Sequence, residues 1–124
     1  MSERSILVID DEPGVREILN IHLRGAGYGV TSAETAAEGL RLVASTDFDL
    51  AICDFTLPDI PGAELIDAVR KARPGLPMMV ISGFIDDVTE EAFRRRGVFE
   101  CLKKPFSKET LLTAIEGLFS AGTE

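Results

Sequence analysis

Residues 48–62 read FDLAICDFTLPDIPG and combine a short apolar run with an aspartate at its end. Leu50 to Cys53 is a short apolar run, as expected for a strand that is buried on both faces of a sheet. Asp54 follows where the run stops, and the prolines and glycine beyond it prevent a strand or helix from continuing. A carboxylate placed there lies at the carboxyl end of a buried strand, the edge where ligands bind in open α/β sheets. From this stretch alone, an aspartate that starts a turn is an equally good interpretation.

Further apolar runs alternate with helical patterns on both sides of this strand. The runs predict strands at residues 5–9, 28–31, 50–54, 78–81 and 98–102. Apolar residues at helical spacing predict helices from Pro13 to Gly25, from about Glu34 to Ser45, from Gly62 to before Pro74, through Val88 to Gly97, and over residues 111–119. Strict alternation with short connections predicts an α/β fold whose parallel sheet is covered by helices on both faces. We expect one domain over residues 1–124, with a core at about 5–119.

The composition narrows the class of protein. A net charge of −8 disfavours direct binding to nucleic acid or to an anionic membrane and leaves room for a cation site. No apolar run is long enough to span a membrane, and nothing before the first strand resembles a signal peptide, so we expect a cytoplasmic protein. Cys53 and Cys101 lie in apolar runs and are predicted to be reduced core residues.

Four of the predicted strands end at residues whose side chains can bind a ligand or take part in a reaction. These are Asp10-Asp11, Asp54, Ser82-Gly83 and Lys103-Lys104. Because the carboxyl ends of parallel strands meet at one edge, three carboxylates, a hydroxyl and a lysine should converge there. Clustered carboxylates repel one another unless a cation lies among them, and hard oxygen ligands suit Mg²⁺ or Mn²⁺. A lysine can contact a phosphoryl oxygen, so the residues indicate an aspartate that accepts a phosphoryl group with the help of a divalent metal.

At this point the sequence resembles the receiver domain of two-component response regulators over nearly its whole length. The resemblance rests on Asp10-Asp11-Glu12, on residues 54–62, on Ser82-Gly83 and on Lys104-Pro105-Phe106, in that order and at strand ends. It implies a flavodoxin-like, doubly wound (βα)5 fold with a parallel five-stranded sheet of order 2-1-3-4-5. It also implies a stand-alone signalling protein, similar to the chemotaxis receivers, that is not an enzyme.

The resemblance assigns the acceptor and the metal ligands. Asp54 would take a phosphoryl group from a histidine kinase or a histidine phosphotransfer protein. Mg²⁺ would be ligated by Asp11, by Asp54 and by the backbone carbonyl of Thr56, while Asp10 would hold a metal-bound water. Mn²⁺ could replace Mg²⁺ in such a site.

The resemblance also assigns a switch. Lys104 would pair with the phosphoryl group across a cis bond to Pro105, and Ser82 would bond to it and shift as the switch hydroxyl. Cys101 stands where the family usually has an aromatic ring that swings inward, and a cysteine has no ring that could make this movement. The phosphorylated protein would signal to a downstream protein through its fourth helix, fifth strand and fifth helix.

Other interpretations stay open. The sequence could be a receiver module excised from a hybrid histidine kinase or a larger regulator, with the same chemistry and a different partner. An interaction module that works without phosphorylation is another alternative, because of Cys101. An aspartyl phosphatase is less favoured, since such enzymes usually have a second acid where Thr56 stands. A nucleotide or flavin binder lacks a glycine-rich loop after the first strand.

Overall fold

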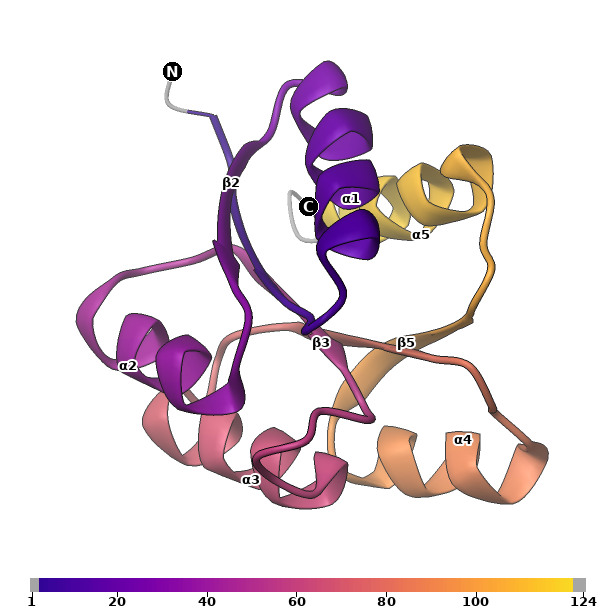
Figure 1. Cartoon of the computed structure of the whole chain (residues 1–124). Helices are drawn as coiled ribbons and strands as arrows, with labels where there is room; N and C mark the ends of the chain where they lie inside the picture. The colour runs from indigo at the N-terminus through magenta and orange to yellow at the C-terminus, as the bar shows by residue number, and fades with distance from the viewer. Residues whose placement is uncertain (1–2, 122–124) are drawn as a thin grey trace.

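Over residues 3–121, which the computed structural model describes, five strands alternate with five helices (Figure 1). The strands are β1 (Ser5–Ile9), β2 (Gly29–Ala33), β3 (Leu50–Asp54), β4 (Met78–Ser82) and β5 (Val98–Lys103). The helices are α1 (Pro13–Gly25), α2 (Ala36–Ser45), α3 (Gly62–Ala72), α4 (Asp87–Arg95) and α5 (Lys108–Ala121). None of these helices is long and apolar enough to cross a membrane.

The strands form one parallel sheet in the order β2-β1-β3-β4-β5, which confirms the predicted fold class and strand order. β1 has β2 on one side and β3 on the other, so the direction of winding reverses there. Ligands of open α/β sheets bind at the carboxyl ends of the strands at such a point. Ile9 and Cys53 are partners in the register of β1 and β3, so the residues that follow them, Asp10 and Asp54, lie next to each other.

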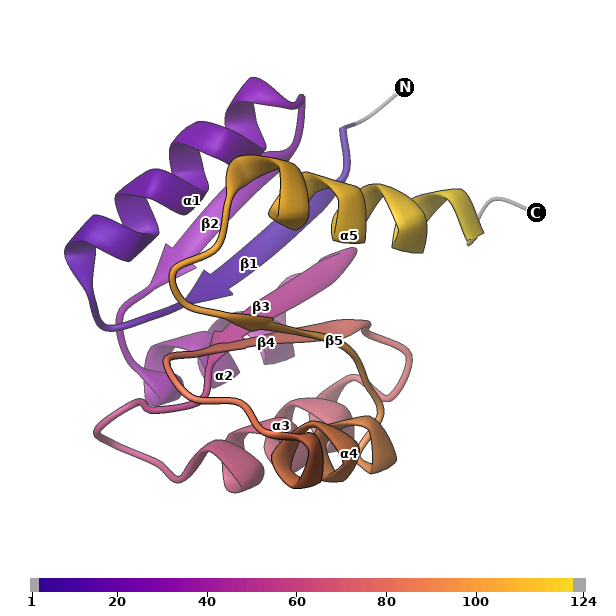
Figure 2. The same ribbon diagram turned by 90° about the vertical axis from the view of Figure 1, so that its right-hand side faces the viewer.

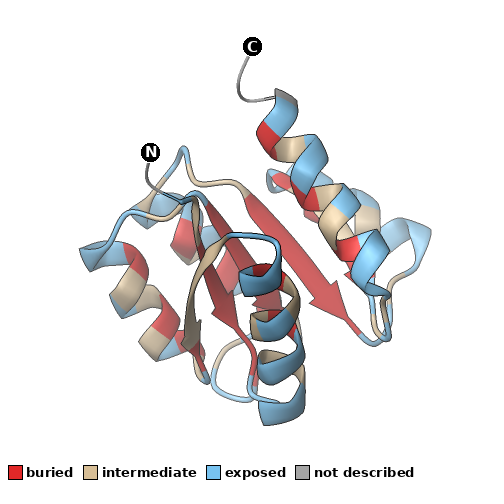
Figure 3. Ribbon diagram, turned by 90° about the horizontal axis from the view of Figure 1, so that it is seen from above, coloured by how far each residue is buried: buried red, intermediate tan, exposed pale blue. Residues whose placement is uncertain are grey.

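Helices cover both faces of the sheet. Figure 2 shows α1 and α5 on one face and α2, α3 and α4 on the other. Along β3, Ala51 and Cys53 pack on the α2–α3–α4 side, and Leu50 and Ile52 on the α1–α5 side. The central strands are buried along their length (Figure 3), because neither face of a doubly wound sheet meets water. Because β3 is buried on both faces, its sequence is an uninterrupted apolar run from Leu50 to Cys53.

Several predicted boundaries are wrong by two or three residues, since α4 ends at Arg95 rather than at Gly97 and α5 begins at Lys108 rather than at residue 111. β2 runs to Ala33 rather than to residue 31, because its pairing with β1 continues as far as Ile9. α2 begins at Ala36, since Thr35 is its N-cap and accepts a hydrogen bond from the N–H of Glu38 (3.1 Å). A threonine followed three residues later by glutamate is a capping signature that the apolar spacing alone does not show.

Both cysteines are free thiols, as predicted, but they differ in burial. Cys53 in the central strand β3 is buried, and burial raises its pKa to about 12. Cys101 is only half-buried, so the prediction that it is a core residue is wrong. It lies on β5, which pairs with β4 alone and forms an edge of the sheet. Partial burial still raises the pKa of Cys101, to about 11.

Helix α2 is fastened at both ends by residues that flank α3. The carboxylate of Asp59 accepts hydrogen bonds from the N–H groups of Ala36 and Ala37, both at 3.1 Å. At the other end, the guanidinium of Arg73 donates to the carbonyl of Val43 (2.9 Å) and pairs with Asp47 (3.0 Å). These contacts satisfy backbone groups that a helix end leaves unpaired.

Helix α4 is connected to its neighbours through arginines. Arg94 donates to the carbonyl of Phe99 (2.7 Å) and pairs with Glu90 (2.8 Å) and Glu100 (3.2 Å), which joins the helix to β5. Arg96, just after the helix, pairs with Asp67 of α3. Two arginines of the run at residues 94–96 therefore connect α4 to other elements of the fold.

Candidate functional site

The carboxylate of Asp54 ends β3 and is 1% exposed. Its Oδ1 accepts hydrogen bonds from the N–H and the hydroxyl of Thr56, both at 3.1 Å, which fix the orientation of the group. Its Oδ2 is buried, and no hydrogen-bond donor among the described residues reaches it. One oxygen of Asp54 is therefore held by the loop, and the other keeps its lone pairs for a ligand or a reaction.

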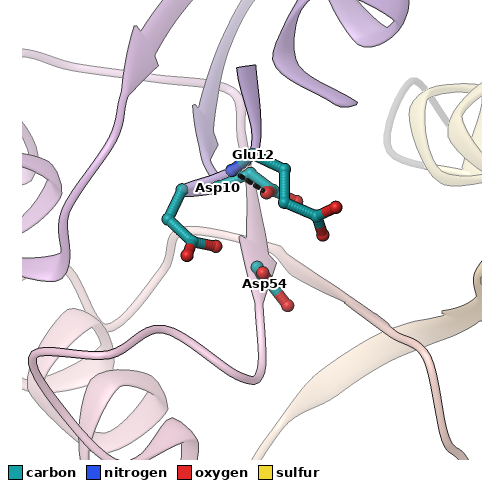
Figure 4. A group of neighbouring side chains, drawn as sticks. Asp10, Glu12 and Asp54 are labelled. Atoms are coloured by element: carbon teal, nitrogen blue, oxygen red, sulfur yellow. Dashed lines mark hydrogen bonds between the residues drawn. The ribbon is translucent and has the colours of Figure 1, made fainter. Parts of the chain in front are cut away.

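Asp10 lies beside it at the end of β1 and is also buried. Its Oδ1 accepts a hydrogen bond from the N–H of Glu12 (2.8 Å), and its Oδ2, like that of Asp54, receives no hydrogen bond from residues 3–121. Figure 4 shows Asp10, Glu12 and Asp54 gathered where the two strands end. Burial raises the pKa of Asp10 and the charge of Asp54 raises it further, against the N–H of Glu12 and the charge of Lys104.

The arrangement fits a divalent cation. Carboxylate oxygens of Asp10, Asp11, Glu12 and Asp54 lie within 4.8 Å of one another. Two of these groups have a buried oxygen without a hydrogen bond, which is costly unless a positive charge compensates it. Lys104 supplies one positive charge against four acids, so the cluster stays negative. Hard carboxylate oxygens are the ligands that Mg²⁺ prefers, and the residues present therefore suit it.

Lys104 enters the same cluster from the end of β5. Its Nζ lies 2.8 Å from Glu12 Oε1, 3.2 Å from Asp10 Oδ2 and 3.5 Å from Asp54 Oδ2. The last two are ion-pair distances without hydrogen-bond geometry, which is why both oxygens remain unsatisfied. Burial lowers the pKa of Lys104, but the hydrogen bond to Glu12 and the charges of the aspartates outweigh it and hold the pKa above its ordinary value. The peptide bond to Pro105 is cis, as the family resemblance implies.

Ser82 ends β4 at the same edge and is buried. Its hydroxyl donates to the carbonyl of Phe84 (3.0 Å) and accepts from the N–H of Phe84 (3.2 Å). Its backbone carbonyl accepts from the N–H of Lys104 (2.7 Å), which aligns the ends of β4 and β5. In this structure the hydroxyl is therefore engaged in the turn after β4.

The structure brings together four of the predicted site residues, namely Asp10, Asp11, Asp54 and Lys104. Thr56 contacts Asp54 through its N–H and hydroxyl. Cys101 packs against the core under α2, α3 and α4.

Glu12, for which no role was predicted from the sequence, lies against Lys104. Because Glu12 directly follows Asp10 and Asp11, the sequence indicates that it lies near the site. The contact itself joins residues 92 positions apart, and no local pattern predicts it.

Comparison with known proteins agrees with this geometry. Residues 6–116 match the model of the response regulator receiver domain, and the chain therefore belongs to this family. Among curated proteins, it is 36% identical over 113 residues to the transcriptional regulatory protein GlrR of Escherichia coli (strain K12), covering 90% of this chain and 25% of that protein. It is 36% identical over 115 residues to the DNA-binding transcriptional regulator NtrC of Rhizobium meliloti (strain 1021), covering 93% of this chain and 24% of that protein. The chain spans about a quarter of the length of these relatives.

Solved structures show the same fold. A CheY-like receiver domain protein from Methanospirillum hungatei JF-1 superposes with a TM-score of 0.91 at 30% identity, covering 97% of this chain and 96% of that one. The chemotaxis protein CheY4 of Vibrio cholerae superposes with a TM-score of 0.86 at 27% identity, covering 93% and 98%. Receiver domains are signalling modules of two-component systems, and an aspartyl phosphate and Mg²⁺ are general features of the family.

Proposed function

We propose that this receiver domain accepts a phosphoryl group on Asp54 from the phosphohistidine of a histidine kinase or a histidine phosphotransfer protein. The observation that carries the proposal is the buried Oδ2 of Asp54, which has no hydrogen-bond donor within the described residues and lies 3.5 Å from Lys104 Nζ. This oxygen has lone pairs available for attack and a cation beside it.

In the proposed reaction, an Asp54 oxygen attacks phosphorus as the phosphorus–nitrogen bond of the donor breaks. The donor imidazole leaves and keeps the electron pair of that bond, and an acyl phosphate forms on Asp54. Lys104 neutralises charge on the transferring group. Asp11, Asp54 and the carbonyl of Thr56 would ligate Mg²⁺, with Asp10 holding a metal-bound water. Bound there, Mg²⁺ supplies further charge neutralisation.

The same proposal includes a switch. Ser82 would leave its two hydrogen bonds to the backbone of Phe84 and donate instead to a phosphoryl oxygen. The turn between β4 and α4 would then change shape, and a surface of α4, β5 and α5 would bind a downstream protein. Cys101 has no ring to swing, so the loop at Phe84 is the direct route from the site to this surface.

A larger regulator is a specific second possibility. The two curated relatives described above are about four times as long as this chain, and their names describe transcriptional regulators. As a module of such a protein, residues of about 5–119 would form the receiver and the downstream partner would be an output domain of the same polypeptide. In either form we propose that the domain works in the cytoplasm.

Intact-mass spectrometry with acetyl phosphate tests the proposal. We expect a single phosphoryl adduct that requires Mg²⁺, is absent from Asp54→Asn and persists in Asp87→Asn, which changes an exposed aspartate on α4. Phosphate release is measured in parallel, because rapid turnover would hide the adduct. Neither adduct nor phosphate release, with a donor that phosphorylates a control receiver, would overturn the proposal, and so would an equal adduct on Asp54→Asn.

A further inference from the structure

Of the three carboxylates around Lys104, the nearest belongs to Glu12 rather than to the proposed acceptor. Nζ lies 2.8 Å from Glu12 Oε1 and 3.5 Å from Asp54 Oδ2. We propose that Glu12 is a positioning residue that holds Lys104 before phosphorylation and competes with the phosphoryl group for its ammonium. This inference rests on the proposed function of Asp54 and adds a residue to which that function gives no role.

The surroundings of Glu12 fix its backbone and leave its side chain free to move. Its N–H donates to Asp10 Oδ1 (2.8 Å), and its carbonyl accepts from the N–H of Arg16 (3.1 Å) in the first turn of α1. It is the N-cap residue of α1, but its side chain makes no capping hydrogen bond. The carboxylate is 59% exposed, so it can turn into solvent when its contact with Lys104 breaks.

The other two partners of Lys104 cannot leave in this way. Asp10 and Asp54 are buried at the ends of the central strands, and each has one oxygen fixed by a hydrogen bond. The side chain of Lys104 is itself only 17% exposed, which restricts it to this group of carboxylates. Lys104 therefore has two fixed partners and one partner that can be released.

A phosphoryl group on Asp54 alters this balance, because it brings extra negative charge next to Nζ. The ammonium then moves toward the phosphoryl oxygens and away from Glu12. Because one partner of the Glu12 contact is exposed, the contact is worth a factor of about two to five in an equilibrium constant. It is strong enough to place Lys104 before a donor arrives and weak enough to be displaced.

Two substitutions separate the contact from the charge. Glu12→Gln removes the charge and leaves at most a weaker hydrogen bond from Nζ to the amide oxygen, whereas Glu12→Asp keeps the charge but shortens the side chain by one methylene, which draws the carboxylate away from Nζ. Glu34→Gln is the matched control, since Glu34 is an exposed acid whose partner is Arg16 (3.8 Å). We measure the initial rate of adduct formation with acetyl phosphate at saturating Mg²⁺, and the Mg²⁺ affinity of each variant by calorimetry.

We expect both variants of Glu12 to form the adduct about two to five times faster than the wild type, and Glu34→Gln to be unchanged. In a Lys104→Ala background, Glu12→Gln should then have no effect on the rate, a result that a purely structural role of Glu12 does not give. The Mg²⁺ affinity of Glu12→Asp should stay within about twofold of the wild type.

Three results would overturn the inference while the wild type is still phosphorylated. If Glu12→Asp behaves as the wild type and Glu12→Gln is faster, the overall charge matters and the contact does not. If Mg²⁺ affinity falls more than about tenfold in both, the main role of Glu12 is to hold or orient the metal site and not to position Lys104. If both variants are slower, Glu12 assists the transfer instead of competing with it. A wild type without adduct or phosphate release would instead overturn the proposed function, and this inference with it.

Discussion

Helices α2 and α4 cover the same face of the sheet, but they are held in different ways (Figure 1). α2 buries three residues, and Asp59 and Arg73 fasten its two ends. Within α4, Phe93 alone is buried, and the remaining contacts are ion pairs and hydrogen bonds of arginines near its end. Helix α2 is therefore held by buried residues and by hydrogen bonds at its two ends. Helix α4 is held by the buried ring of Phe93 and by exposed ion pairs.

The contrast is sharpest next to the candidate site. Phe84 and Val88, in the turn after β4 and the first turn of α4, are 68% and 78% exposed. A segment with few buried apolar contacts opens at low free energy, and moving elements are drawn from such segments. Ser82 connects this segment to the edge that holds Asp54. We therefore expect phosphorylation of Asp54 to alter the conformation of α4 and to leave α2 and α3 unchanged.

The largest expected effect comes from Phe93→Ala. Phe93 packs edge-to-face against Phe55, with ring centroids 4.5 Å apart, and truncating a buried phenylalanine costs about 3 kcal/mol or more. Because α4 then has no buried side chain, its amide hydrogens should exchange much faster while those of the central strands stay protected. Urea unfolding and hydrogen exchange measure the two effects. Phe84→Ala, at an exposed ring, is the control and should change stability little. Unchanged protection of α4 in Phe93→Ala would contradict the comparison.

A smaller effect is expected at the ends of α2. Asp59→Ala leaves the N–H groups of Ala36 and Ala37 without their partner, and losing such a cap costs about 1 kcal/mol. Arg73→Ala should cost a similar amount at the other end, and the two losses should add because the sites are far apart. Urea unfolding of both single variants and the double variant checks this. Additive losses close to zero would show that α2 is not fastened as we describe.

The contribution of Asp59 should depend on pH. Its hydrogen bonds from the N–H groups of Ala36 and Ala37 lower its pKa, so folding stabilises the carboxylate form. A depressed pKa contributes stability that is present above the unfolded value of about 3.9 and is lost as the pH falls through the folded value. The difference in unfolding free energy between wild type and Asp59→Ala should thus be constant above about pH 5 and shrink in acid. A difference that grows in acid would contradict this assignment.

Arg94→Ala should have a still smaller effect. Arg94 joins α4 to β5 through Glu100 and the carbonyl of Phe99, but exposed ion pairs are worth about 0.2–1 kcal/mol and weaken in salt. Hydrogen exchange in α4 should increase a few-fold at low ionic strength, with little change in global stability. Arg95→Ala is the matched control, because Arg95 pairs only with Glu91 on the outer face of the helix among the contacts described here. Equal effects of the two variants would show that the link to β5 does not hold α4.

The sequence predicts the fold well, because the doubly wound sheet leaves a direct trace in it. Strands that are buried on both faces have sequences made of apolar runs. Because all five strands are parallel, Asp10, Asp54 and Lys104 lie at the same edge of the sheet. The predictions that were less accurate concern features set by contacts between residues far apart in the sequence. The half-burial of Cys101 follows from the edge position of β5, and the end of β2 from its pairing with β1. The contact between Glu12 and Lys104 could be found only from the structure.

Hydrogen exchange of the protein with and without acetyl phosphate, in the presence of Mg²⁺, shows whether a phosphoryl group on Asp54 acts through α4. We predict that exchange changes in the segment from Ser82 to Arg96, stays the same in α2 and α3, and does not respond to the donor in Asp54→Asn. A response of equal size in α2 and α3, or none in the segment from Ser82 to Arg96 when the adduct is present, would contradict the claim that a phosphoryl group on Asp54 acts through α4.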